Sequence, residues 1–144
     1  SKDAADVLKL KLITVPVSRV EELDVAYASM TAMRPDAVLV FSDALMVNWG
    51  AQIAAFALKA GFPLFGEFSL YARNGGLMSY GASLDDMAQR VAGYIDRIFK
   101  GARPAGMPVE RVSTFELVIN LKVAKTLGIT VSPSVLLRAD EVIP

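Results

Sequence analysis

The amino-acid sequence predicts an α/β fold, in which a parallel sheet is flanked by helices on both faces. Short apolar runs, typical of strands, alternate four times with longer segments whose apolar residues recur at helical spacing. Most of these runs are apolar throughout, as expected for strands that are buried on both faces. The 144 residues are enough for one domain with a substantial core and short for two.

The first part of the chain is expected to contribute a strand, a helix and a second strand. Lysines alternate with apolar residues around Leu10–Val15, which predicts a strand near a sheet edge. A helix should follow, with Ser18 as its cap and Glu21 completing a capping box, and Pro35 should end it. The continuous apolar run at 37–41 then predicts a buried strand.

The middle of the chain predicts two more strands, at 63–67 and 76–80. A helix that ends at Gly61 should precede the first of them, because glycine commonly follows the last helical turn. After the second strand, Ser83 and Asp86 should cap a long helix. Apolar residues recur on one face of that helix, namely Leu84, Met87, Val91, Ile95 and Ile98.

The last third begins with a glycine- and proline-rich hinge at 100–108, a composition of low intrinsic order. Residues 115–121 predict a fifth strand and residues 122–128 a short helix. We expect a terminal helix over 132–144, because Pro133 is tolerated in the first turn of a helix.

The composition narrows the chemistry that the chain can perform. Lysine plus arginine equals aspartate plus glutamate, 15 against 15, so charge gives no argument for a nucleic-acid or anionic-membrane partner. Cysteine and histidine are both absent from the sequence, which removes thiolate chemistry, the usual general base and the commonest metal ligands. We therefore expect no catalytic residues, no metal site and no cofactor. No apolar run approaches the roughly 20 residues that span a bilayer.

Polar residues lie at the ends of three of the predicted strands or directly after them. In open parallel sheets, ligands bind outside the carboxyl ends of the strands, which makes these residues candidates for a binding site. Helix starts nearby favour anions such as a carboxylate, and Asp43 or Glu67 would suit an ammonium group. The candidate ligand-binding residues are Ser42, Asp43, Ala44, Glu67, Ser79 and Tyr80.

Each candidate also has a purely structural interpretation. Asp43 is most simply a helix cap, and Tyr80 can be a half-buried aromatic at a strand end. A phosphoryl-accepting Asp43 would need carboxylates after the first strand to hold magnesium, and none stand there. A serine nucleophile lacks both a histidine and a G-x-S-x-G turn, and the glycine-rich phosphate motifs are absent.

The order of several motifs resembles the carboxyl-terminal part of ABC-transporter substrate-binding proteins. These motifs are SYG before a capped helix, KGARPAGMPVE, FELVINLKVAKTLGI and SPSVLLRADEVI. Residues 36–68 resemble the same family more loosely. The specificity lies in the order and spacing of the motifs. The resemblance is to the group that includes tryptophan and tyrosine binders and adopts the type 1 periplasmic-binding-protein fold.

The resemblance implies that residues 1–144 form a single α/β domain, one lobe of a two-lobed fold and a fragment of a longer chain. Residues 1–74 would be the core of the second lobe, and 75–144 the crossing segments and carboxyl-terminal helices. Such a protein is the solute-binding component of an ABC importer, outside the cytoplasm, and delivers a small molecule to a permease. The ligand could be an amino acid or small carboxylate, although Ala44 replaces a polar residue common in amino-acid binders.

Two alternatives remain open from the sequence. The same scaffold could be a ligand-sensing regulatory domain, which a DNA-binding segment upstream would support. A small α/β enzyme is the third interpretation, disfavoured by the absence of histidine and cysteine. As an isolated fragment, the chain is expected to form a homo-oligomer, because the missing lobe would leave apolar surface and sheet edges uncovered.

Overall fold

The computed structural model describes residues 2–144. By its internal contacts the chain divides into two compact units, Ser1–Pro35 and Asp36–Pro144. The first unit is helical and the second holds a five-stranded sheet. No helix in the described part of the chain is both long and apolar enough to cross a membrane.

The first unit contains a predicted helix that starts slightly later than expected. Ser18 donates its backbone N–H to the carboxylate of Glu22 at 2.7 Å, so the acidic partner is Glu22 instead of Glu21. The helix ends at Arg34, which adopts a left-handed conformation directly before Pro35. The elements of this unit are α1 (Lys2–Val7), the 3₁₀ turn η1 (Val20–Glu22) and α2 (Leu23–Met33).

The strand predicted at Leu10–Val15 is wrong, because these residues belong to no strand. Lys9 has a φ of 54°, and Leu10 donates its N–H back to the carbonyl of Ala5 at 2.8 Å, which completes a turn after α1. An alternating pattern predicts which side chains share a face, but a strand exists only where a ladder partner satisfies its backbone. Residues 10–15 pair with no strand of the described chain.

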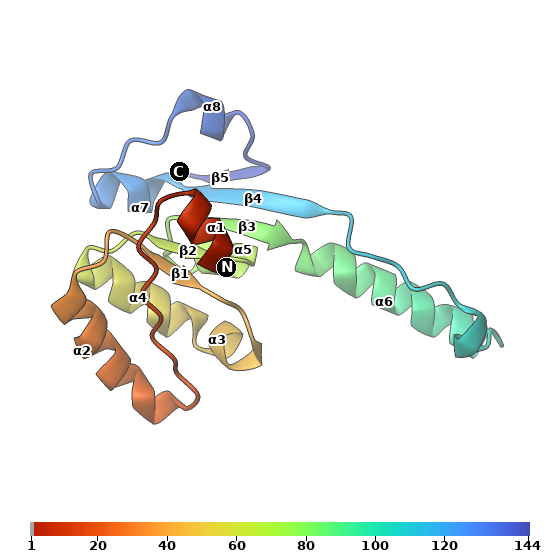
Figure 1. Cartoon of the computed structure of the whole chain (residues 1–144). Coiled ribbons are helices and arrows are strands. Elements are labelled where there is room, and N and C mark those ends of the chain that lie inside the picture. Colours follow the sequence, from red (N-terminus) through yellow and green to blue (C-terminus); the bar gives the residue numbers. More distant parts are fainter. Residues whose placement is uncertain (1) are drawn as a thin grey trace. The chain divides into compact units, whose positions relative to one another are not determined.

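The second unit is built on a sheet with the strand order β1-β2-β3-β4-β5 (Figure 1). The first three strands run parallel, β4 is antiparallel to β3, and β5 is parallel to β4. The sheet is therefore mostly parallel, and the mixed α/β class is confirmed. The strands are β1 (Val38–Val40), β2 (Leu64–Gly66), β3 (Met78–Ala82), β4 (Phe115–Asn120) and β5 (Glu141–Ile143).

Helices α4, α6 and α7 of the second unit begin and end close to the predicted positions. Gly61 follows α4 in the left-handed conformation, with a φ of 80°. The hydroxyl of Ser83 accepts from the N–H of Asp86 at 3.4 Å and caps α6 as predicted. The helices are α3 (Ala44–Asn48), α4 (Gly50–Ala60), α5 (Ser69–Arg73), α6 (Leu84–Phe99), η2 (Pro104–Gly106), α7 (Leu121–Thr126) and α8 (Pro133–Leu136).

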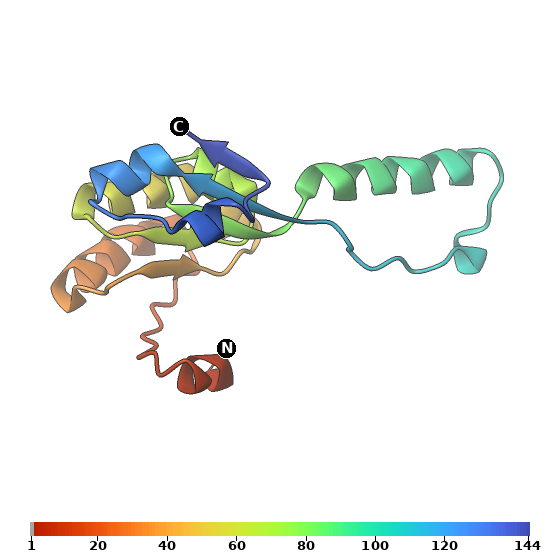
Figure 2. The same ribbon diagram turned by 90° about the horizontal axis from the view of Figure 1, so that it is seen from above.

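Residues 83–114 form an arm that leaves the sheet at the end of β3 and returns at the start of β4 (Figure 2). The outward half of the arm is α6, and the return half contains η2. Because the chain leaves and re-enters the sheet at the same edge, β4 must run opposite to β3. The backbone N–H of Ser83 donates to the carbonyl of Thr114 at 3.1 Å, where the two halves meet.

The terminal helix predicted over 132–144 is wrong beyond its first turn. Only Pro133–Leu136 is helical, and the chain then forms β5. Asp140 fixes this ending, because its N–H donates to the carbonyl of Leu117 and its carboxylate accepts from the N–H of Leu117. Pairing with β4 satisfies backbone groups that a longer helix would have satisfied internally.

One face of the sheet is closed and the other is partly open. Val40, Gly66 and Ser79 lie in register on neighbouring strands and are buried, with Ser79 only 1% exposed. The next row, on the opposite face, includes Leu39, which is 55% exposed. The prediction that the strand at 37–41 is buried on both faces is therefore wrong, because the face of β1 that carries Leu39 is open to solvent.

Candidate functional site

The parallel strands β1, β2 and β3 end at one edge of the sheet. Val40 pairs with Gly66, and Gly66 pairs with Ser79, so the residues that follow these three positions leave the sheet together. Ser42 and Asp43 follow β1, and Glu67 follows β2. Tyr80 lies within β3, one residue beyond the pairing with β2, and pairs with Leu117 of β4. The structure thus places all three predicted strand-end segments at the same edge, which we call the binding edge.

A residue that the sequence did not single out lies beneath the binding edge. Tyr71 on α5 is 0% exposed, and the hydroxyl of Ser42 donates to the Tyr71 hydroxyl at 3.5 Å, a long hydrogen bond. Burial raises the pKa of Tyr71, the hydrogen bond from Ser42 lowers it, and the negative charges of Asp43 and Glu67 raise it. Two carboxylates from different strand ends therefore lie within electrostatic reach of one phenol.

Asp43 combines the two roles that the sequence left open. Its Oδ1 accepts from the backbone N–H groups of Leu45 at 2.9 Å and of Met46 at 2.8 Å, which caps α3. The side chain is exposed, and within residues 2–144 its second oxygen has no hydrogen-bond partner. A carboxylate that is fixed through one oxygen can present the other to a ligand without first being ordered. Ala44 is the first residue of the short helix that follows.

Glu67 reaches toward β3 because a glycine makes room for it. A Cβ on Gly81 would lie 2.2 Å from the carbonyl oxygen of Glu67 and 2.8 Å from its Cγ. No other residue type would fit at Gly81 without moving the end of β2. Glu67 itself is exposed. The end of β2 is thus held against β3, with an acidic side chain open to solvent.

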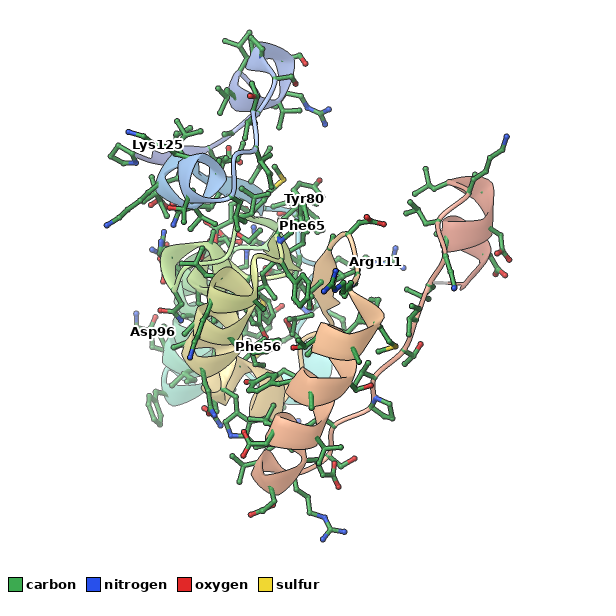
Figure 3. The ribbon with its side chains drawn as sticks, turned by 90° about the vertical axis from the view of Figure 1, so that its left-hand side faces the viewer. Phe56, Phe65, Tyr80, Asp96, Arg111 and Lys125 are labelled. Carbon is green, nitrogen blue, oxygen red and sulfur yellow. The ribbon has the colours of Figure 1, made fainter. Side chains whose placement is uncertain are left out.

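Ser79 and Tyr80 point to opposite faces of the sheet. The Ser79 hydroxyl oxygen is buried, and no partner for it occurs among the described residues. Tyr80 is 64% exposed and stacks on Phe115, with ring centroids 6.1 Å apart. Phe65 of β2 pairs with Met78 of β3, so its side chain lies on the same face of the sheet as that of Tyr80. Both Phe65 and Tyr80 are labelled in Figure 3. The binding edge therefore has a polar side near Ser42 and an aromatic side near Tyr80.

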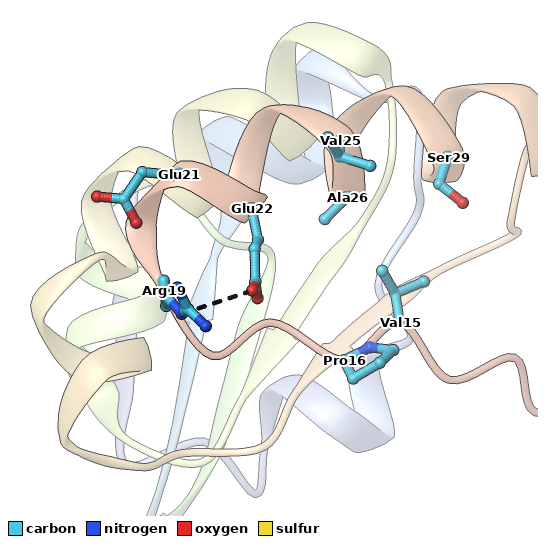
Figure 4. A pocket seen from close by; sticks show the side chains of 8 residues that line it. All are labelled: Val15, Pro16, Arg19, Glu21, Glu22, Val25, Ala26 and Ser29. Carbon is cyan, nitrogen blue, oxygen red and sulfur yellow. Dashed lines mark ion pairs between the residues drawn. The ribbon is translucent and has the colours of Figure 1, made fainter.

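Two cavities occur elsewhere in the described chain. One, of about 450 Å³, lies within the first unit around α2 and includes the Arg19–Glu22 ion pair at 4.0 Å (Figure 4). The other, of about 420 Å³, lies in the arm between α6 and residues 104–112. Neither cavity is lined by any of the six predicted ligand-binding residues.

The likeness of the chain to known proteins extends over nearly its whole length. The family model for ABC transporter substrate binding proteins matches residues 1–143. The chain belongs to this family. The resemblance that the motifs indicated is thereby confirmed, and the match also covers the first 35 residues, which lie outside those motifs. The comparison with curated proteins found no match.

Solved structures show what this family's fold looks like. A conserved domain protein from Vibrio cholerae is 25% identical, with a TM-score of 0.87 over 98% of this chain. The ABC domain of Streptococcus pneumoniae, solved in complex with L-Trp, is 30% identical, with a TM-score of 0.86 over 99% of this chain. Nearly all of this chain therefore shares its fold with about half of each of these two proteins.

A more distant structure shares the fold alone. It is the ligand-free, open form of a substrate-binding protein with adhesive properties from Clostridium difficile, 18% identical over 99% of this chain, with a TM-score of 0.66. This chain covers only 47% of that structure, 47% of the Vibrio cholerae protein and 48% of the Streptococcus pneumoniae protein. This chain spans about half the length of the solved structures that it matches.

Proposed function

We propose that this chain is one lobe of a solute-binding protein that captures a small molecule carrying an ammonium group at the binding edge. The observation that supports this most directly is the gathering of Ser42, Asp43 and Glu67 around the buried Tyr71 hydroxyl. Both carboxylates are exposed. A structural relative was solved with L-Trp, a zwitterion that contains such a group.

The chemistry of the binding edge favours a cation over an anion. Two carboxylates raise the local negative potential, and a desolvated ammonium group interacts most strongly with charged acceptors. The exposed Tyr80–Phe115 pair offers an apolar and aromatic wall on the other face of the sheet. An amine attached to an apolar or aromatic body fits both features. In this role the lobe binds its solute and catalyses no reaction.

The other half of the binding site would come from a second lobe of the protein, since the solved relatives are about twice as long as this chain. Closure of two lobes around a solute is a common way to signal occupancy to a partner protein. We propose that the partner is an ABC permease and that delivery takes place outside the cytoplasm, as expected for this family. Self-association of the isolated chain stays a prediction.

Thermal unfolding in the presence of candidate solutes tests this function. Amino acids, amines without a carboxylate and carboxylates without an amine are each added to the protein that contains both lobes. A ligand at 100 times its Kd stabilises the folded state by about 2.7 kcal/mol, which raises the midpoint by several degrees. We expect shifts from the compounds that carry an amine, and a response to carboxylates alone would contradict the ammonium assignment.

Two charge-neutralising variants locate the site. Asp43→Asn keeps a side-chain oxygen that can cap α3, so it removes the charge and leaves the helix start intact. Glu67→Gln removes the second charge in an exposed position. Each should weaken binding of the amine by about tenfold or more. The matched control is Asp96→Asn on α6, where the lost charge pairs only with Lys100 at 2.8 Å. Equal affinities in all three variants would place the solute elsewhere.

A further inference from the structure

The ring of Tyr71 lies in a socket that two glycines create. A Cβ on Gly66, at the end of β2, would approach the Tyr71 ring to 2.3 Å. A Cβ on Gly50, the first residue of α4, would lie 3.3 Å from the Tyr71 Cε1 atom and 2.9 Å from Leu70. Contacts below 3.0 Å are closer than packed carbon atoms tolerate, so a side chain at Gly66 would displace the ring. The ring therefore fits here because Gly66 lacks a side chain, and Gly50 leaves additional room beside it.

Hydrogen bonds fix the backbone of Tyr71 and of the residue that follows it. The Tyr71 N–H donates to the carbonyl of Phe68 at 3.0 Å, and its carbonyl accepts from the N–H of Gly76 at 2.8 Å. The next residue, Ala72, accepts from the side-chain amide of Asn120 at 2.9 Å, which joins α5 to the end of β4. Asn120 is buried and also caps α7. Hydrogen bonds thus tie the five-residue helix α5 to the end of β4, and α5 also packs against β2 and β3.

The hydroxyl of Tyr71 is the point where this rigid assembly meets the binding edge. Ser42 donates to it across 29 positions of sequence, from the segment that links β1 to α3. Because Tyr71 is 0% exposed, a solute at the edge cannot touch it while the lobe keeps this structure. An effect of the hydroxyl on binding therefore acts through neighbouring residues, and Ser42 is the one hydrogen-bonded to it.

We propose that Tyr71 is a positioning residue of the binding edge, whose socketed ring and hydroxyl hold Ser42, and with it Asp43, in the arrangement that binds solute. The proposal rests on the proposed function, since it assigns a role within the same site. The proposal adds to the site a residue that does not itself contact the solute. It also explains why position 66, at the end of β2, is a glycine. In this arrangement the contact with Tyr71 orders the backbone of residues 42–43 before any solute binds.

A first experiment needs no ligand. Tyr71→Phe keeps the ring in its socket and deletes only the hydroxyl, so the variant should fold. Backbone amide order parameters of Ser42 and Asp43, measured by NMR, should fall from about 0.85 toward about 0.6, while those of α4 stay unchanged. The matched control is Tyr94→Phe on the arm, which deletes a phenol hydroxyl that donates to the carbonyl of Pro108. Unchanged order parameters at residues 42 and 43 in Tyr71→Phe would overturn the proposal.

A second experiment uses a bound amine and a double-mutant cycle. Tyr71→Phe and Ser42→Ala should each weaken binding by about tenfold, the equivalent of one hydrogen bond. The double variant should bind no more weakly than either single variant, because both changes break the same link. A purely structural role would make the two losses multiply, which would overturn the proposal. If the unmodified two-lobed protein binds no amine, the proposed function fails, and the order parameters alone then decide the role of Tyr71.

Discussion

Helices α4 and α6 both carry apolar residues at helical spacing, yet their surroundings differ completely. Four residues of α4 are buried, and Ala54 and Ala57 are at most 1% exposed. No residue of the longer α6 is buried, and its apolar face keeps Val91 57% and Ile95 46% exposed. The comparison teaches that periodicity predicts a helix and its apolar face, whereas the packing partner of that face depends on the rest of the fold.

The two helices are also stabilised by different kinds of interaction. Helix α4 contributes buried side chains to the body of the second unit. The arm is held largely by polar contacts, in which Arg90 binds Asp86, Glu110 and Ser113 at 2.8–3.2 Å. The guanidinium of Arg97 also lies 4.4 Å from the centre of the Tyr94 ring. Exposed contacts of this kind contribute little free energy compared with apolar burial.

The largest expected difference in the free energy of unfolding comes from introducing a charged side chain into α4 and, separately, into α6. Ala54→Asp puts an unpaired carboxylate at a position that is 0% exposed, and it should reduce the free energy of unfolding by about 4 kcal/mol or more. Ala88→Asp makes the same change at an exposed position of α6 and should alter that free energy by about 0.5 kcal/mol or less. Urea unfolding of both variants measures the difference. Similar losses would show that α6 is packed as tightly as α4.

Two glycine substitutions give an intermediate effect with opposite signs. Gly66→Ala forces a Cβ to within 2.3 Å of the Tyr71 ring, so the free energy of unfolding should fall by about 2–3 kcal/mol. Gly93→Ala on α6 meets nothing within 4 Å and should raise it by about 0.5–1 kcal/mol, because alanine loses less entropy in a helix. Denaturation midpoints at matched m values report both changes. A stable Gly66→Ala protein would mean that α5 can shift away from the sheet.

The smallest effects compare one polar contact from each region. Asn120→Ala leaves the buried N–H of Val123 without its acceptor and removes one of the two donors to the carbonyl of Ala72, which keeps the N–H of Gly75. The expected cost is about 2 kcal/mol. Lys100→Gln breaks only the exposed pair with Asp96 on the arm, a loss of about 0.3 kcal/mol that added salt should abolish. Unfolding measured at low and high ionic strength separates the two. A salt-dependent effect of Asn120→Ala would contradict its assignment as a buried cap.

Much of the fold was predictable because it depends on local chemistry. The cap at Ser83 and the left-handed Gly61 were read correctly from residue types that act within one helical turn. The short strands β1 and β2 lie within the predicted ranges, since continuous apolar runs between turn residues predict them, whereas β3 begins and ends two residues later than predicted. Where a prediction failed, at Leu10–Val15 and at β5, the outcome depended on a ladder partner distant in sequence.

The candidate site divides in the same way. Ser42, Asp43 and Glu67 could be selected because polar residues after strands mark a predictable edge. Tyr71 could not, because SLYARNG is an ordinary helical turn in the sequence, and nothing in it indicates which side chain is buried. Its glycine neighbours gave a faint signal, since Gly66 ends a strand where a larger residue would be usual.

The sequence by itself determined where the helices and most strands form, which faces are apolar and which family the motifs resemble. Only the tertiary structure decided that β4 runs against β3, that α6 extends from the sheet, and that Tyr71 lies beneath three strand ends. The physical reason is range: caps, turns and periodicity act over a few residues, whereas strand pairing and burial join segments separated by tens of residues.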